Sequence, residues 1–191
     1  MGMGTNMNRE ELIHDVIERE LVMFLNTKNM GGTASCQENP DMFRQWRWMI
    51  FSVLSDEYIA SYKEDLIEAE RVGRNLMTEK YARMDNLIPC VSPNIAKVRK
   101  ITATERDWMQ QLLQEFPLLF PQSLARFDMY FPAEMETLSE RSLDLYQACV
   151  DEALRTGENL ARKRYSNFYQ RMGLGTLEEL EARRREKIHQ S

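Results

Sequence analysis

One 28-residue stretch occurs twice in this chain, and this repeat constrains the fold more than any other feature. Residues 54–81 (LSDEYIASYKEDLIEAERVGRNLMTEKY) return at residues 138–165 (LSERSLDLYQACVDEALRTGENLARKRY), 84 positions later and without a gap. Ten positions are identical, including the pattern E-A-x-R-x-G-x-N-L. Self-similarity at one fixed offset is typical of a repeated structural unit. The sequence therefore predicts an internally duplicated protein.

The composition favours an all-α fold. Only 8 Gly and 6 Pro occur in 191 residues, and residues with high helix propensity dominate. We expect a single domain over residues 1–191, with half-units at about 8–88 and 102–172 and a charged C-terminal helix at 176–188. The expected architecture is a bundle of about seven helices, in which the two long repeat helices pack near a pseudo-twofold axis.

The glycine in each copy of the repeat is compatible with two structures. Val72-Gly73 resembles the end of a helix. Apolar or small residues nevertheless continue past the glycine at helical spacing in both copies, as far as Leu76 and Leu160. Because a loop would normally reset that spacing, we predict one long helix in each copy, with Ala and Gly facing a neighbouring helix.

Capping signals mark the other helices. The first helix is expected to begin near Asn8, and the second at Asn39-Pro40, where an N-cap residue precedes a proline. Between the copies we predict a short helix over residues 95–101. A capping box formed by Thr102 and Glu105 then predicts the start of another helix, which ends before Pro117.

Glu20 lies within the apolar stripe of the first helix, between Ile17 and Phe24. Two interpretations stay open. A carboxylate at this position is either desolvated, and then needs a hydrogen-bond donor or a positive partner, or it is partly exposed at the edge of the stripe.

Cys36 is the clearest single candidate for chemistry. It lies in an irregular polar segment just before a helix, whose dipole would stabilise a thiolate. Asn29, Thr33 and Gln37 in the same segment offer donors for a substrate carbonyl. A Cys–His pair would require His14 to be brought close by the fold. The alternative is a small buried thiol with a structural role.

Glu68, Arg71 and Asn75 would share one face of the predicted long helix. The triple recurs at the corresponding positions of the second copy. A Glu–Arg pair beside an amide can hold a carboxylate, an amide or a helix end. The alternative is a structural network that joins this helix to its neighbour.

Several classes of protein are disfavoured. Three cysteines without a CxxC pair and only two histidines argue against a disulfide framework, a zinc site and a His-rich metal centre. The net charge of −5 argues against nucleic-acid binding. Since no apolar run is long enough for a membrane span and no signal peptide is evident, we expect a cytoplasmic protein. No cofactor is indicated.

The loop sequence ASCQ and the segment GRNLMTEKYARM carry a resemblance to a known family. The chain resembles bacterial proteins grouped as domain of unknown function 4125, which are helical and internally duplicated. Some members are joined to nucleotidyltransferase-like domains, which implies a place in small-molecule metabolism. The matching positions are Glu20, Phe24, Asn29, residues 31–37, Phe43, Arg47 and residues 68–84.

The hypothesis we favour is a small-molecule enzyme or ligand-binding protein with a polar pocket between the Gly-Gly-Cys loop and the first repeat helix. Its expected catalytic residues are Cys36 and Glu20. The expected ligand-binding residues are Asn29, Thr33, Gln37, Arg47, Glu68, Arg71, Asn75 and Tyr81. The alternatives are a helical interaction module for a partner enzyme and a thiol-based sensor that uses Cys36. A homodimer is compatible with each.

Overall fold

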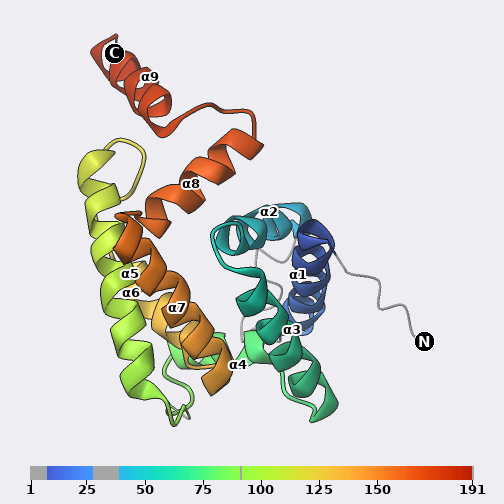
Figure 1. Cartoon of the computed structure of the whole chain (residues 1–191). Coiled ribbons are helices and arrows are strands. Elements are labelled where there is room, and N and C mark those ends of the chain that lie inside the picture. Colours follow the sequence, from blue (N-terminus) through green and yellow to red (C-terminus); the bar gives the residue numbers. More distant parts are fainter. Residues whose placement is uncertain (1–7, 28–38, 91, 191) are drawn as a thin grey trace.

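The computed structural model describes residues 8–27, 39–90 and 92–190, and within these ranges it consists of α-helices without any strand (Figure 1). The all-α prediction is confirmed. The nine helices of the described residues are α1 (Arg9–Leu25), α2 (Pro40–Phe51), α3 (Asp56–Arg71), α4 (Leu76–Met84), α5 (Ile95–Glu115), α6 (Ala125–Met135), α7 (Glu140–Thr156), α8 (Leu160–Arg171) and α9 (Leu177–His189).

Side-chain caps fix where several helices begin. The side chain of Asn8 accepts from the backbone N–H of Glu11, and the Glu11 carboxylate accepts from the Asn8 N–H, which completes a capping box. Asn39 caps α2 with Pro40 at its first position. Both predicted helix starts are therefore confirmed.

The predicted long repeat helices are wrong, because each is two helices joined at the glycine. Gly73 and Gly157 adopt φ values of +73° and +72°, in the left-handed region that ends helices. The N–H of the residue after each glycine then donates back across the turn, to Ala69 O and to Ala153 O, at 2.8 Å in both copies.

The unbroken apolar spacing has a different cause from the one we inferred. Leu76 and Leu160 are buried, but they belong to the first turn of the next helix, whose apolar side faces the same core. Two helices that share a core can mimic the periodicity of one. This split raises the number of helices above the expected seven.

The predicted helix start at Thr102 is also wrong. Thr102 lies inside α5, which runs without a break from Ile95 to Glu115. Ile101 and Trp108 belong to one continuous buried stripe of this helix, so the apolar face does not end where the capping-box pattern occurs. Glu105 is fully buried and does not act as a capping residue.

The helices form two groups that meet along α3 and α7. In the first group α1 packs against α2, α3 and α4; in the second α5 packs against α6, α7 and α8 (Figure 1). The groups also exchange contacts, since α2 packs against α8 and α4 against α6. At the α3–α7 contact the buried hydroxyls of Ser61 and Ser142 lie 2.8 Å apart, and the rings of Tyr58 and Tyr146 meet edge to face.

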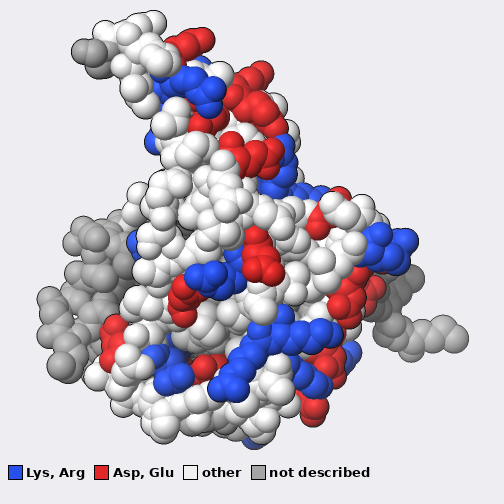
Figure 2. All heavy atoms as spheres, turned by 90° about the vertical axis from the view of Figure 1, so that its left-hand side faces the viewer, with Lys and Arg blue, Asp and Glu red and all other residues white. Residues whose placement is uncertain are grey.

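The charged helix α9 projects from one end of the molecule (Figure 1). It is anchored to the loop after α5, where the Glu181 carboxylate accepts from Leu118 N–H at 3.1 Å and Arg184 donates to Leu118 O at 2.8 Å. On the face seen in Figure 2, acidic and basic side chains lie intermixed, on α9 as well as below it.

The two glycine turns provide a stability test. Nothing lies within 4 Å of a Cβ placed on Gly73 or Gly157, so Gly→Ala should be penalised only for the left-handed backbone. We expect each variant to lose about 1 kcal/mol of unfolding free energy in denaturant titrations. Gly157→Asn should lose less, because Asn tolerates this conformation. A continuous helix would instead gain up to about 1 kcal/mol from alanine.

Candidate functional site

A cluster of buried charges joins α1, α2, α3, α4 and α6. Arg47 donates from Nε and Nη2 to the Glu20 carboxylate at 2.7 and 2.6 Å, and the Tyr62 hydroxyl donates to Glu20 at 2.7 Å. Arg47 also donates to Glu134 at 3.0 and 3.1 Å, and Lys80 Nζ donates to Glu134 at 3.2 Å. We call these five residues the first charge cluster.

The first charge cluster is electrically balanced, with two carboxylates against two cations. Burial alone would raise the pKa of the Glu134 carboxyl, but Arg47 and Lys80 outweigh it and bring that pKa to about 2. Burial, together with Glu20, raises the pKa of the Tyr62 phenol well above its usual range, so the phenol stays a donor. Every carboxylate oxygen of the cluster accepts a hydrogen bond, which makes it a structural clamp.

A smaller second charge cluster lies in the other half of the chain. The Tyr146 hydroxyl and Arg164 Nη2 each donate to Glu105 at 2.7 Å. Burial would lower the pKa of Arg164, but the Glu105 carboxylate reverses this and raises it. Tyr146 and Arg164 lie 84 positions after Tyr62 and Lys80, and Glu105 lies 85 positions after Glu20.

The structure resolves the two interpretations of Glu20 in favour of the buried, paired carboxylate. Arg47, also predicted for the site, is its partner. Tyr81 borders the first charge cluster through Lys80, whose Nζ lies 5.1 Å from the centre of the Tyr81 ring. The Tyr81 ring also packs against Phe24, with ring centroids 6.0 Å apart. These predicted residues do come together.

Glu68 and Arg71 do not join them. They form an exposed ion pair at 2.6 Å, and Glu152 and Arg155 repeat it at 2.5 Å. Asn75 does not share their helix, so the prediction of a common helical face is wrong.

Asn75 is instead the N-cap of α4. Its side chain accepts from Thr78 N–H at 2.9 Å and donates to Met23 O at 2.8 Å; Asn159 does the same for Arg162 and Trp108. The repeated E-A-x-R-x-G-x-N-L pattern thus encodes a corner between two helices and its attachment to a third. The remaining predicted residues, Asn29, Thr33, Cys36 and Gln37, lie outside the described residues.

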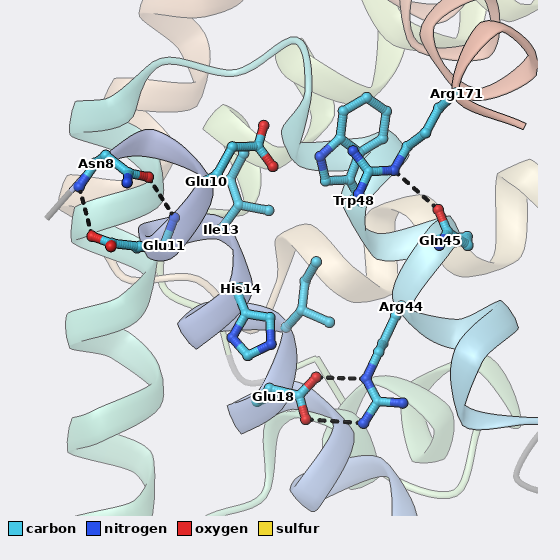
Figure 3. Close-up of a pocket in the computed structure, with 11 residues that line it drawn as sticks. Asn8, Glu10, Glu11, Ile13, His14, Glu18, Arg44, Gln45, Trp48 and Arg171 are labelled. Carbon is cyan, nitrogen blue, oxygen red and sulfur yellow. Dashed lines mark hydrogen bonds and ion pairs between the residues drawn. The ribbon is translucent and has the colours of Figure 1, made fainter.

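A separate cavity of about 480 Å³ opens between α1, α2 and the end of α8 (Figure 3). We call it the α1–α2–α8 cavity. Its apolar wall is formed by Ile13, Ile17 and Trp48, and on its α1–α2 side Glu18 and Arg44 form an ion pair at 2.6 Å. The other lining residues are Asn8, Glu10, Glu11, His14, Gln45 and Arg171.

Two charges at this cavity have no ion-pair partner among residues 8–27, 39–90 and 92–190. The Arg171 guanidinium lies 4.1 Å from the centre of the Trp48 ring and donates only to the neutral Gln45, at 3.2 Å. The Glu10 carboxylate accepts no hydrogen bond from any described residue. In Figure 3 it points toward the Trp48 indole, and the Arg171 guanidinium overlaps that ring in the view. We call Glu10 and Arg171 the facing charges.

A second cavity, of about 490 Å³, lies in the corresponding place of the other half, against α5 and Pro132 of α6. Five of its lining residues lie 85 positions after residues of the first: Ile95, Val98, Arg99, Thr102 and Ala103 correspond to Glu10, Ile13, His14, Ile17 and Glu18.

The chemistry of the two cavities differs. In the second, Ile95 replaces the acid at position 10, and Pro132 stands 84 positions after Trp48. Its carboxylate, Glu136, is paired with Arg83 at 2.5 and 3.2 Å. A cavity is therefore present at this place in both halves, whereas the facing charges occur only in the first.

Sequence reasoning missed the residues of the α1–α2–α8 cavity. It considered His14 only as a possible partner of Cys36. Trp48 is only half-buried. No local pattern places Arg171 beside α2, because that neighbour is set by the packing of α2 on α8.

The described residues contain neither a group of three or more His, Cys, Asp and Glu side chains able to hold a metal ion nor a helix long and apolar enough to cross a membrane. In comparison with protein families, the model described as "Protein of unknown function (DUF4125)" matches residues 10–182. The chain belongs to this family. Comparisons with curated proteins and with solved structures gave no match.

The DUF4125 match includes both charge clusters and both facing charges, whereas the last turns of α9 lie beyond it. The resemblance inferred from the loop and repeat residues is thereby confirmed. The family description assigns no reaction, so function has to be argued from the geometry.

The first charge cluster of this DUF4125 protein predicts a pH-dependent contribution to stability. The pKa of Glu134 falls from 4.5 to about 2 on folding, so its contribution is complete above pH 4.5 and lost as the pH falls toward 2. That shift corresponds to about 3 kcal/mol. Glu134→Gln should lose roughly 3–5 kcal/mol at pH 7 in denaturant titrations.

The difference in unfolding free energy between the wild type and Glu134→Gln should decrease as the pH is lowered from 4.5 to 2. Glu68→Gln, which breaks an exposed pair, is the control and should unfold at nearly the wild-type denaturant concentration. A constant gap at all pH values would contradict the proposed ionisation of Glu134.

Proposed function

We propose that this protein binds a small organic molecule in the α1–α2–α8 cavity. The observation that carries the proposal is the placement of the facing charges, which lack an ion-pair partner among the described residues, in a cavity lined by the half-buried Trp48 ring. A volume of about 480 Å³ falls within the range of small-ligand sites. The proposal keeps the small-molecule binding expected from the sequence and places the site at a different set of residues.

The contrast with the first charge cluster supports this choice. There each carboxylate oxygen already accepts from Arg47, Lys80 or Tyr62, so a ligand would have to break buried pairs, at a large cost in free energy. At the α1–α2–α8 cavity a ligand gains new charge-assisted hydrogen bonds without breaking any ion pair, and the wall of Ile13, Ile17 and Trp48 adds apolar burial.

We also infer that the two halves of the chain arose by duplication of one helical unit. Matched turns at Gly73 and Gly157, and matched caps at Asn75 and Asn159, support it. The helix contacts have the same pattern when α1–α4 are exchanged for α5–α8, including the α2–α8 and α6–α4 contacts. On this inference the α1–α2–α8 cavity is the copy that kept or acquired a ligand.

The proposal predicts a ligand effect confined to one of the three tryptophans. Nuclear magnetic resonance of the indole N–H groups, during a screen of small charged and aromatic compounds, should show shifts of the Trp48 signal. Trp108 is buried elsewhere and should not respond. Replacing Trp48 by Phe assigns its signal.

A matched pair of variants tests whether the cavity itself is the site. His14→Trp places a large side chain in the α1–α2–α8 cavity and should abolish the shifts. Arg99→Trp does the same at the corresponding position of the second cavity and should leave them unchanged. Shifts that persist in His14→Trp, or a screen without any Trp48 response, would refute the proposal.

A further inference from the structure

The facing charges differ in sign, which restricts the chemical class of the ligand. We infer that the α1–α2–α8 cavity takes a zwitterionic α-amino acid with an apolar or aromatic side chain. This inference rests on the proposed function and adds the identity of the ligand class. Its basis is the charge balance of the cavity wall, residue by residue.

The other carboxylate and guanidinium groups at the cavity are already engaged. Arg44 donates to Glu18 at 2.6 and 3.1 Å and to Asp41 at 2.9 Å. Glu11 is held in the capping box of α1, where it accepts from Asn8 N–H at 3.0 Å. A ligand therefore meets one carboxylate and one guanidinium, the facing charges.

A ligand with a single charge would satisfy only one of these two groups. An amine would pair with Glu10 and bring no acceptor to Arg171, and a carboxylate would pair with Arg171 and bring no donor to Glu10. An ammonium group and a carboxylate on one small molecule serve both, each through a charge-assisted hydrogen bond. Arg171 can also hold a carboxylate through two parallel N–H donors.

The apolar part of the cavity wall determines which side chain the amino acid can have. The buried Ile13 and Ile17 line the cavity together with the half-buried Trp48 ring, on which the Arg171 guanidinium stacks. An apolar or aromatic side chain gains from contact with this surface, whereas a charged one would lose its hydration there.

The second cavity provides an internal comparison. Ile95 and Pro132 stand where the first cavity has Glu10 and Trp48. The second cavity therefore lacks two groups. It has no carboxylate at the position that would hold the ligand's ammonium group, and it has no aromatic ring at the position of Trp48. An α-amino acid should bind only in the first half of the molecule.

Isothermal titration calorimetry at pH 7 with three probes that share a phenyl ring tests this inference on the full chain. L-Phenylalanine carries both charges, phenethylamine only the ammonium group, and 3-phenylpropionate only the carboxylate. L-Phenylalanine should bind most tightly, and loss of either charge should weaken binding about tenfold or more.

Two variants should separate the probes. Glu10→Gln should weaken L-phenylalanine and phenethylamine about tenfold and leave 3-phenylpropionate unchanged. Arg171→Gln should weaken L-phenylalanine and 3-phenylpropionate and leave phenethylamine unchanged. Glu57→Gln is the matched control for Glu10, since both are exposed acids at the second position of a helix, and Arg99→Gln is the control for Arg171. Neither control should alter binding.

The outcomes distinguish this inference from the proposed function. Equal affinity for the three probes, abolished by His14→Trp, would overturn the zwitterionic ligand while supporting a site in the cavity. Failure of all three probes to bind would overturn the amino-acid ligand, and the proposed function would then depend on the Trp48 screen alone. Binding of L-phenylalanine that survives both Glu10→Gln and Arg171→Gln would also overturn the inference.

Discussion

Arg47 makes the interaction on which the arrangement of helices most depends. Its guanidinium lies between Glu20 of α1 and Glu134 of α6, and so connects the first helix group to the second. Charges this deeply buried are tolerated only when each has a partner in good geometry, since an unpaired buried ion costs several kcal/mol. The first charge cluster therefore admits few alternative packings of α1, α2 and α6.

The second half shows what happens without this arginine. Position 131, which lies 84 residues after Arg47, is Phe131, and it stacks on Phe127 and meets the edge of Tyr146. Glu105 consequently has donors on one oxygen, while its other oxygen has no hydrogen-bond partner among the described residues. The two halves have matching glycine turns and asparagine caps, but their buried side chains differ, and Phe131 packs among aromatic rings instead of pairing with a carboxylate.

Much of this could be predicted from the sequence, for reasons that are local. Capping residues predicted the starts of α1 and α2. The position of Glu20 in an apolar stripe left two interpretations open, and the structure shows the buried, paired carboxylate. The prediction of long repeat helices was wrong because apolar spacing reports only which residues face the core. Leu76 faces the same core after the turn as Leu66 does before it. The glycine was the residue that indicated the helix end. A left-handed turn at the glycine, followed by an asparagine N-cap, explains why both the Gly and the Asn recur in the two copies.

The α1–α2–α8 cavity could not be derived in this way, because it exists only once α8 has packed on α2. Where charges are buried in the first charge cluster, the fold supplies every partner; where Glu10 and Arg171 line a cavity, it supplies an aromatic ring and a neutral amide but no counter-ion among the described residues. The second cavity has the same walls in outline and no such pair of charges. Packing alone accounts for a cavity in each half. It does not account for two opposite charges beside an aromatic ring, without a counter-ion among the described residues, in only one of them.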